Sequence, residues 1–115
     1  MRRRPVSVIE LAAYQRRADD LLTAEERDAV IDLIAYEPTC GDLIPGTGGL
    51  RKVRVGRGSG GKRGGARVIY YFCNVDFPLV LMALHAKNEK ADLTGRDKKT
   101  LAATLKEIMA SWRRK

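Results

Sequence analysis

The sequence predicts a small α+β domain in which helices pack on an antiparallel β-sheet. The chain has 115 residues, which is the size of one domain. Its hydrophobic fraction of 44% is typical of a globular protein rather than a disordered one. Apolar residues change between a spacing of two and a helical spacing, in the order strand, two helices, three strands and helix. We therefore expect residues 1–115 to form a single domain.

Each expected helix and strand is predicted by its own feature of the sequence. Residues 5–10 alternate as a short strand, and helical spacing follows from residue 11 to residue 22. Thr23 and Glu26 read as a capping box that opens a second helix, which Pro38 ends. A glycine-rich loop is expected over residues 39–49, and strands over 50–55, 67–73 and 79–85. The last helix is expected to start after Thr94, with Asp97 in its first turn and with a buried stripe of Leu101, Leu105, Ile108 and Trp112.

The charge is unevenly distributed along the chain. The net charge is +8; residues 7–42 hold nine acids and three bases, whereas residues 43–75 hold seven bases and no acid. Like charges repel one another, so a block of one sign favours a polyanion as partner. Each of its arginines can form two parallel hydrogen bonds to a phosphate group. A solvated basic surface is the alternative.

Several other function classes lack their signals. No apolar run approaches the ~20 residues of a membrane helix, and Met1–Pro5 is basic without the apolar stretch of a secretory signal. Cys40 and Cys73 form no CxxC pair, so we expect no zinc site, no cofactor and a reduced, cytoplasmic protein. Residues 56–62 fit GxxxxGK, but Arg63 stands where a P-loop needs Ser or Thr. This segment is either a basic arm that orders on nucleic acid or a plain hairpin linker.

Strand parity groups a set of side chains that could carry chemistry. If the hairpins pair in order, one open sheet face can gather Lys52, Arg54, Arg67, Tyr71, His85 and Lys87. Cations, an imidazole and a phenol suit cleavage of an RNA phosphodiester without a metal, because the reaction needs a base, an acid and stabilisation of a phosphorane. His85 is the only histidine, and a lone histidine at a strand end more often has a structural role. Tyr70 and Tyr71 point to opposite faces, and we expect Tyr70 in the core.

Three segments carry a resemblance to a known family. They are GDLIPGTGGLRKVR over residues 41–54, KRGGARVIYYF over 62–72, and KNE over 87–89. Together they resemble the HigB branch of the RelE/ParE superfamily, toxins of bacterial type II toxin–antitoxin systems, over about residues 6–112. The resemblance implies two N-terminal helices and a C-terminal helix on a small twisted sheet. It also implies mRNA cleavage in the A site of the 70S ribosome and neutralisation by an antitoxin with a helix-turn-helix domain.

Residue by residue, the strand cations of RelE-like toxins match Lys52, Arg54 and Arg67, and the segment after the last strand matches Lys87 and Asn88. Three positions depart from the family pattern. Ala86 stands where relatives have a small residue that is usually Gly. Leu93 stands where RelE has an aromatic residue, and His85 stands where a tyrosine is common. The missing aromatic puts the acid–base scheme of RelE in doubt, and His85 could supply that function. The residues expected to bind RNA or the ribosome are Arg51, Arg57, Lys62, Arg63 and Asn88.

Two other functions remain open on the same fold. One is inhibition of DNA gyrase, as in ParE, and the other is RNA binding without catalysis by an inactivated relative. Fold alone cannot separate these functions. The retained strand cations favour RNA cleavage.

Overall fold

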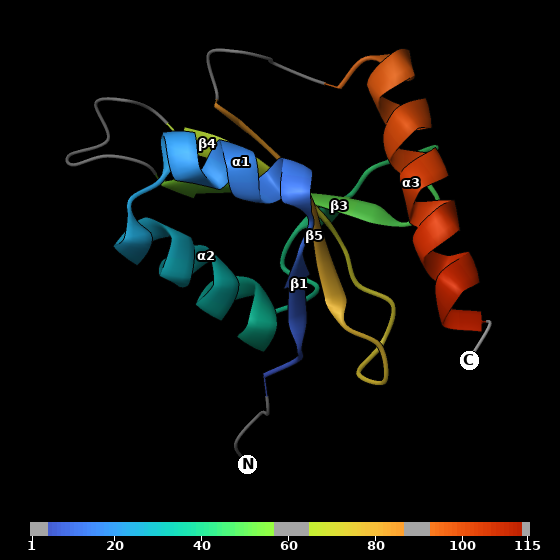
Figure 1. Cartoon of the computed structure of the whole chain (residues 1–115), viewed down its shortest axis with the longest axis horizontal. Helices are drawn as coiled ribbons and strands as arrows, with labels where there is room; N and C mark the ends of the chain where they lie inside the picture. The colour runs from blue at the N-terminus through green and yellow to red at the C-terminus, as the bar shows by residue number, and fades with distance from the viewer. Residues whose placement is uncertain (1–4, 57–64, 87–92, 114–115) are drawn as a thin grey trace.

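The computed structural model describes residues 5–56, 65–86 and 93–113. The strands form one five-stranded sheet in the order β1-β5-β4-β3-β2. Helices α1 and α2 lie on one side of this sheet and α3 lies on the other (Figure 1). In chain order the elements are β1 (Val8–Glu10), α1 (Ala12–Leu21), α2 (Ala24–Tyr36), β2 (Asp42–Leu43), β3 (Leu50–Gly56), β4 (Gly65–Tyr71), β5 (Leu79–Ala86) and α3 (Gly95–Arg113).

The predicted α+β architecture and the order of its main elements are confirmed. The capping box of α2 is present: the Glu26 N–H donates to Thr23 Oγ1 at 3.0 Å, and the Thr23 N–H donates to Glu26 Oε1 at 2.9 Å. Thr94 and Asp97 make the same reciprocal pair at the start of α3. Across the residues described, no helix combines the length and the apolar character needed to cross a membrane.

The sheet differs from the expected one at its two edges. Strands β2 to β5 pair antiparallel, but β1 pairs parallel to β5, with Val8 beside Leu79. Two helices follow β1 before the next strand, so no hairpin reverses its direction relative to β5. At the other edge, β2 is a two-residue strand inside the loop expected over residues 39–49.

Each face of the sheet has its own core. The face under α1 and α2 buries Tyr14, Ala18, Val30 and Ile34 of these helices against Ala66, Val68, Tyr70, Leu79, Leu81 and Leu84. The face under α3 buries Leu105 against Ile44, Leu50, Ile69, Tyr71, Val80 and Met82. Helices on both faces explain why β4 and β5 are apolar at nearly every position.

A β-bulge in β5 changes which side chains face α3. Ile69 pairs with Ala83 but Tyr70 pairs with Leu81, so Met82 is the extra residue. Strict alternation from Leu81 would put His85 on the α1/α2 face, since both numbers are odd. The bulge instead turns Ala83 and His85 to the α3 face, where Arg67 lies.

Candidate active site

Three adjacent strands place a row of polar side chains across the α3 face. Arg54 on β3 pairs with Arg67 on β4, and Arg67 pairs with His85 on β5. Adjacent strands lie ~4.8 Å apart, so the row spans about 10 Å. Two arginines directly opposite each other are electrostatically unfavourable, and an anion bound between them removes the penalty. The row is therefore suited to holding a phosphate.

A pocket of about 240 Å³ opens beside this row. Lys52 contributes to it from β3 and Arg67 from β4, and Ile44 and Pro45 form its wall from the segment between β2 and β3. Leu93 and Lys98, before and within the start of α3, complete the lining. The pocket thus joins three cations from three elements to an apolar wall, which suits a phosphate attached to an apolar or aromatic group.

Lys98 was not among the site residues expected from the sequence. It lies in the first turn of α3, where its N–H donates to the carbonyl of Thr94 at 3.0 Å. A cation at a helix N-terminus is unfavourable for the helix dipole, but Arg96 and Lys99 share this signal with Lys98. The helix end and the lysine add positive potential to the same pocket.

The apolar wall is held by a tight glycine-rich turn. The Thr47 hydroxyl donates to the Ile44 carbonyl at 2.7 Å and accepts from the Leu50 N–H at 3.1 Å, and Thr47 is buried. Gly49 has φ +116°, and a Cβ there would lie 3.2 Å from the Tyr71 ring. The GTGG part of the sequence signature is therefore structural, since it shapes the wall of the pocket.

Arg51 contacts the loop that precedes β3. It lies on the opposite face from Lys52, and its Nη1 donates to the carbonyls of Gly41 at 2.7 Å and Thr39 at 3.3 Å. The Tyr70 hydroxyl secures the same loop, accepting from the Gly41 N–H at 2.8 Å and donating to the Pro38 carbonyl at 2.9 Å. Arg51 Nη1 thus holds this loop on the face opposite Lys52, and the expectation that Arg51 binds RNA stays a prediction.

Tyr71 does not line an open groove with the cations. It lies four positions from Arg67 on β4, about 13 Å along the strand, and is buried in the core beneath α3. Burial, followed by its contact with Cys73, raises the pKa of its hydroxyl. The expected placement of Tyr71 is therefore wrong, whereas the core position expected for Tyr70 is confirmed.

The remaining expected site residues lie outside the described residues: Arg57, Lys62, Arg63, Lys87 and Asn88. The described ranges contain no group of three or more His, Cys, Asp or Glu side chains placed to hold a metal ion.

No family model matches the chain. Among solved structures, the chain is similar to the E. coli toxin RelE, determined in the free state with two arginine-to-alanine substitutions. The TM-score is 0.58 at 9% sequence identity, and the match covers 87% of this chain and 96% of the RelE chain. The architecture is therefore that of a three-helix, mixed-sheet α+β domain, and its particular form is the RelE toxin fold.

Proposed function

We propose that this protein is a ribosome-dependent mRNA endonuclease, the toxin of a bacterial type II toxin–antitoxin system of the HigB branch. The observation that carries the proposal is the convergence of Lys52, Arg67 and Lys98 on one pocket beside the Arg54–Arg67–His85 row. The RelE toxin fold and the acid-free block over residues 43–75 support the same conclusion. Its proposed partners are the 70S ribosome, mRNA and an antitoxin with a helix-turn-helix domain, in the cytoplasm.

The proposed reaction is an in-line attack within the RNA. A base removes the proton of the 2′-hydroxyl as its oxygen bonds to the neighbouring phosphorus, and an acid protonates O5′ as the P–O5′ bond breaks. The products are a 2′,3′-cyclic phosphate and a 5′-hydroxyl. Arg67 and Lys52 stabilise the charge that develops on the phosphorane oxygens. His85 ends the row, and an imidazole can accept or donate a proton near neutral pH, so it is our candidate for the general acid or base. The proposal includes no metal or cofactor.

The size of the pocket limits what it can hold. Its volume of about 240 Å³ is below the roughly 300–1,000 Å³ of sites that enclose a whole drug-sized ligand. We infer that it accepts the scissile phosphate and part of one nucleotide, with Ile44, Pro45 and Leu93 beside the base or sugar. The rest of the mRNA would then be positioned by the ribosome.

Purified protein added to ribosomes programmed with a defined mRNA tests the proposal. We expect new RNA 5′ ends, mapped by primer extension, that need both the protein and the ribosome. DNA gyrase supercoiling, assayed in parallel, should be unaffected. Inhibition of gyrase without RNA cleavage would replace the proposal with a ParE-like function, and ribosome binding without cleavage would replace it with a non-catalytic one.

A further inference from the structure

Helix α3 presents a line of three cations to solvent. Lys99, Lys106 and Arg113 are all exposed, and each stands seven residues from the next. Seven residues are almost two full turns of an α-helix and advance it by about 10.5 Å. The three side chains therefore follow a nearly straight line about 21 Å long. We call these three residues the basic stripe.

The basic stripe lies away from both the core and the candidate active site. Helix α3 forms the outer layer on its side of the sheet (Figure 1). Its side chains that pack toward the sheet, Leu101, Ile108 and Trp112, point on average about 140° away from the stripe. Lys98, which lines the pocket, is one position from Lys99 and so about 100° away round the helix. The stripe is therefore a separate surface.

The charge of the basic stripe is not neutralised within the part of the chain that the structure describes. None of the three cations makes an ion pair there. The exposed acid beside the stripe is Glu107, which is about 100° from Lys106 round the helix. Only Ala103 and Ala110 lie between the cations on this side of α3. The surface thus combines accessible positive charge with small side chains.

This combination favours one class of partner. Protein interfaces are typically anchored by large side chains in packed pockets, and single-stranded nucleic acid is held by stacking on aromatic rings. The basic stripe has no aromatic and no large apolar side chain. Contacts with phosphates need only cations, and a straight line of cations matches a continuous duplex backbone. The minor groove of an RNA duplex is wide and shallow, so a helix with alanines on its outer side can lie close to it.

We propose that the outer side of α3 binds the phosphate backbone of double-stranded RNA without regard to its sequence. Lys99, Lys106 and Arg113 each contact a phosphate, and Ala103 and Ala110 let the helix approach the minor groove. The net charge of +8 assists the association. This inference does not depend on the proposed endonuclease activity, since it concerns binding by a surface away from the pocket.

Fluorescence anisotropy with the full chain and a labelled RNA duplex of about 16 base pairs tests the proposal. The triple variant Lys99→Gln, Lys106→Gln, Arg113→Gln should bind about 10²–10³-fold more weakly at about 0.1 M salt, since three phosphate contacts are lost. The slope of log affinity against log salt concentration should become shallower by about three. The variant Lys99→Arg, Lys106→Arg, Arg113→Lys keeps every cation and should bind like the parent.

A matched exchange separates the stripe from the overall charge. Lys106→Glu combined with Glu107→Lys leaves the composition and the net charge of +8 unchanged, but moves one cation about 100° round the helix. This exchange should weaken duplex binding by about tenfold, because one phosphate contact is lost. Circular dichroism should show the same helix content in parent and variants, since all the changed positions are exposed.

Four results would overturn the proposal. One is an unchanged salt slope in the triple glutamine variant. Another is parental affinity in the Lys106–Glu107 exchange, which would show that net charge alone attracts the duplex. The third is equal or tighter binding of a DNA duplex or of single-stranded RNA of the same sequence. The fourth is loss of duplex binding in Arg67→Ala with full binding in the triple variant, which would place the duplex at the pocket.

Discussion

The two faces of the sheet differ in how tightly the helices pack on them. On the α1/α2 face, Tyr14, Ala18 and Ile34 of the helices are completely buried. On the other face, α3 has 19 residues but buries only Leu105. On this face Arg54 is exposed, and Arg67 and His85 are half-buried. The tightest helix packing and the strand arginines thus lie on opposite faces, because burying a charge without a partner is costly.

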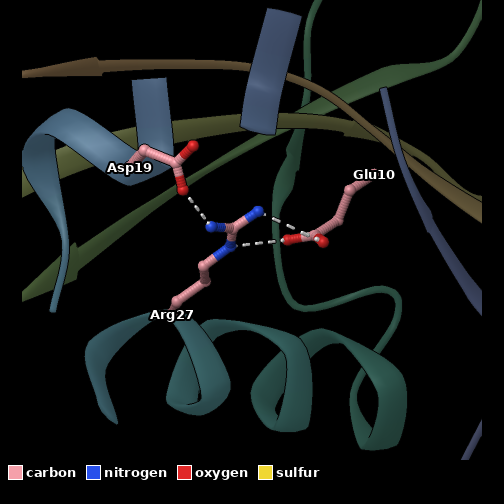
Figure 2. A network of polar contacts seen from close by, with 3 residues as sticks. All are labelled: Glu10, Asp19 and Arg27. Atoms are coloured by element: carbon pink, nitrogen blue, oxygen red, sulfur yellow. Dashed lines mark hydrogen bonds and ion pairs between the residues drawn. The ribbon is translucent and has the colours of Figure 1, made fainter. Parts of the chain in front are cut away.

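The helices on the tightly packed face are also linked by charge. Arg27 of α2 lies between Asp19 of α1 and Glu10 of β1 (Figure 2). Its Nε is 3.1 Å from Glu10 Oε2, and its Nη1 is 2.5 Å from Asp19 Oδ1. The hydrogen bond with Glu10 is the main cause that raises the pKa of Arg27. The Arg27 guanidinium thus joins β1, α1 and α2. Helix α3 is held to the rest of the domain by a different kind of contact.

An aromatic pair near the C-terminal end of α3 holds this helix. Trp112 stacks on Phe77, from the connection between β4 and β5, with ring centroids 5.0 Å apart. The expected role of Trp112 in packing is therefore confirmed. A stack of this kind stabilises by about 0.5–1.5 kcal/mol beyond its buried area. It fixes the far end of α3 and leaves the first turn, with Lys98, beside the pocket.

Among the variants considered, the largest effect is expected for a substitution of Arg67, on the α3 face. Arg67→Ala should lower the rate of ribosome-dependent cleavage by roughly 10²–10³-fold, the loss typical of one donor to a developing oxyanion. Arg67→Lys should restore only part of the rate, because an ammonium cannot form the paired hydrogen bonds of a guanidinium. Primer extension on programmed ribosomes measures both. Arg16→Ala, on the exposed surface of α1, is the control, and a folded Arg67→Ala protein that cleaves at the parent rate would exclude the proposed site.

The tightly packed face should dominate stability. Leu81→Ala, at a completely buried position against α1 and α2, should lower the free energy of unfolding by about 2–5 kcal/mol. Leu101→Ala, at a half-buried position on α3, should lower it by only about 1 kcal/mol because less apolar surface is lost. Urea denaturation measures the two values. Equal losses would contradict the difference between the faces.

Two buried tyrosines on the same face test the role of a hydroxyl. Tyr70→Phe should lower the free energy of unfolding by about 1–3 kcal/mol, since it leaves the Gly41 N–H and Pro38 carbonyl without their partner. Tyr14→Phe should be neutral or stabilising, because the buried Tyr14 hydroxyl has no hydrogen-bond partner among the described residues. A comparable loss in both variants would show that the two hydrogen bonds of the Tyr70 hydroxyl are not the cause.

The same tyrosines predict how stability changes at alkaline pH. Burial is the main cause that raises the pKa of both Tyr14 and Tyr70 from 10.0 to about 12. A pKa raised by folding stabilises the protein below the unfolded value, and the contribution is lost as pH rises from about 10 through about 12. Unfolding free energies measured from pH 9 to 12 should therefore fall across this range. The double variant Tyr14→Phe, Tyr70→Phe should fall less steeply, and a slope identical to that of the parent would contradict the assignment.

The smallest effect is expected at Lys98, on the rim of the pocket. Lys98→Ala should slow cleavage by about tenfold, because a hydrogen bond to a charged group contributes about 1.5 kcal/mol. Lys98→Arg should retain most of the rate. Lys99→Ala, at the exposed neighbouring position, is the control for helix propensity and net charge. If both alanine variants slow cleavage equally, Lys98 acts through the overall positive electrostatic potential of the protein and not through a contact in the pocket.

Local signals in the sequence determined the helices and most of the strands. The capping pairs Thr23–Glu26 and Thr94–Asp97 set two helix starts because both partners lie within four residues of each other. Alternation in β3 put Lys52 and Arg54 on one face, and the hairpin order brought Arg67 opposite Arg54. The capping and alternation inferences succeeded because they depend on neighbours in the chain. The pairing of Arg54 with Arg67 succeeded because β3 and β4 are consecutive antiparallel strands.

Only the tertiary structure decided which of the other candidates reach the site. β5 is apolar at every position except His85, so its pattern gives no sign of the bulge that turns His85 toward Arg67. Whether Arg51 binds the loop carbonyls, Tyr71 lies under α3 and Lys98 reaches the pocket depends on how segments far apart in sequence are placed. Residue type and spacing specify which face a side chain takes on its own element. What lies above that face is set by the packing of the whole chain.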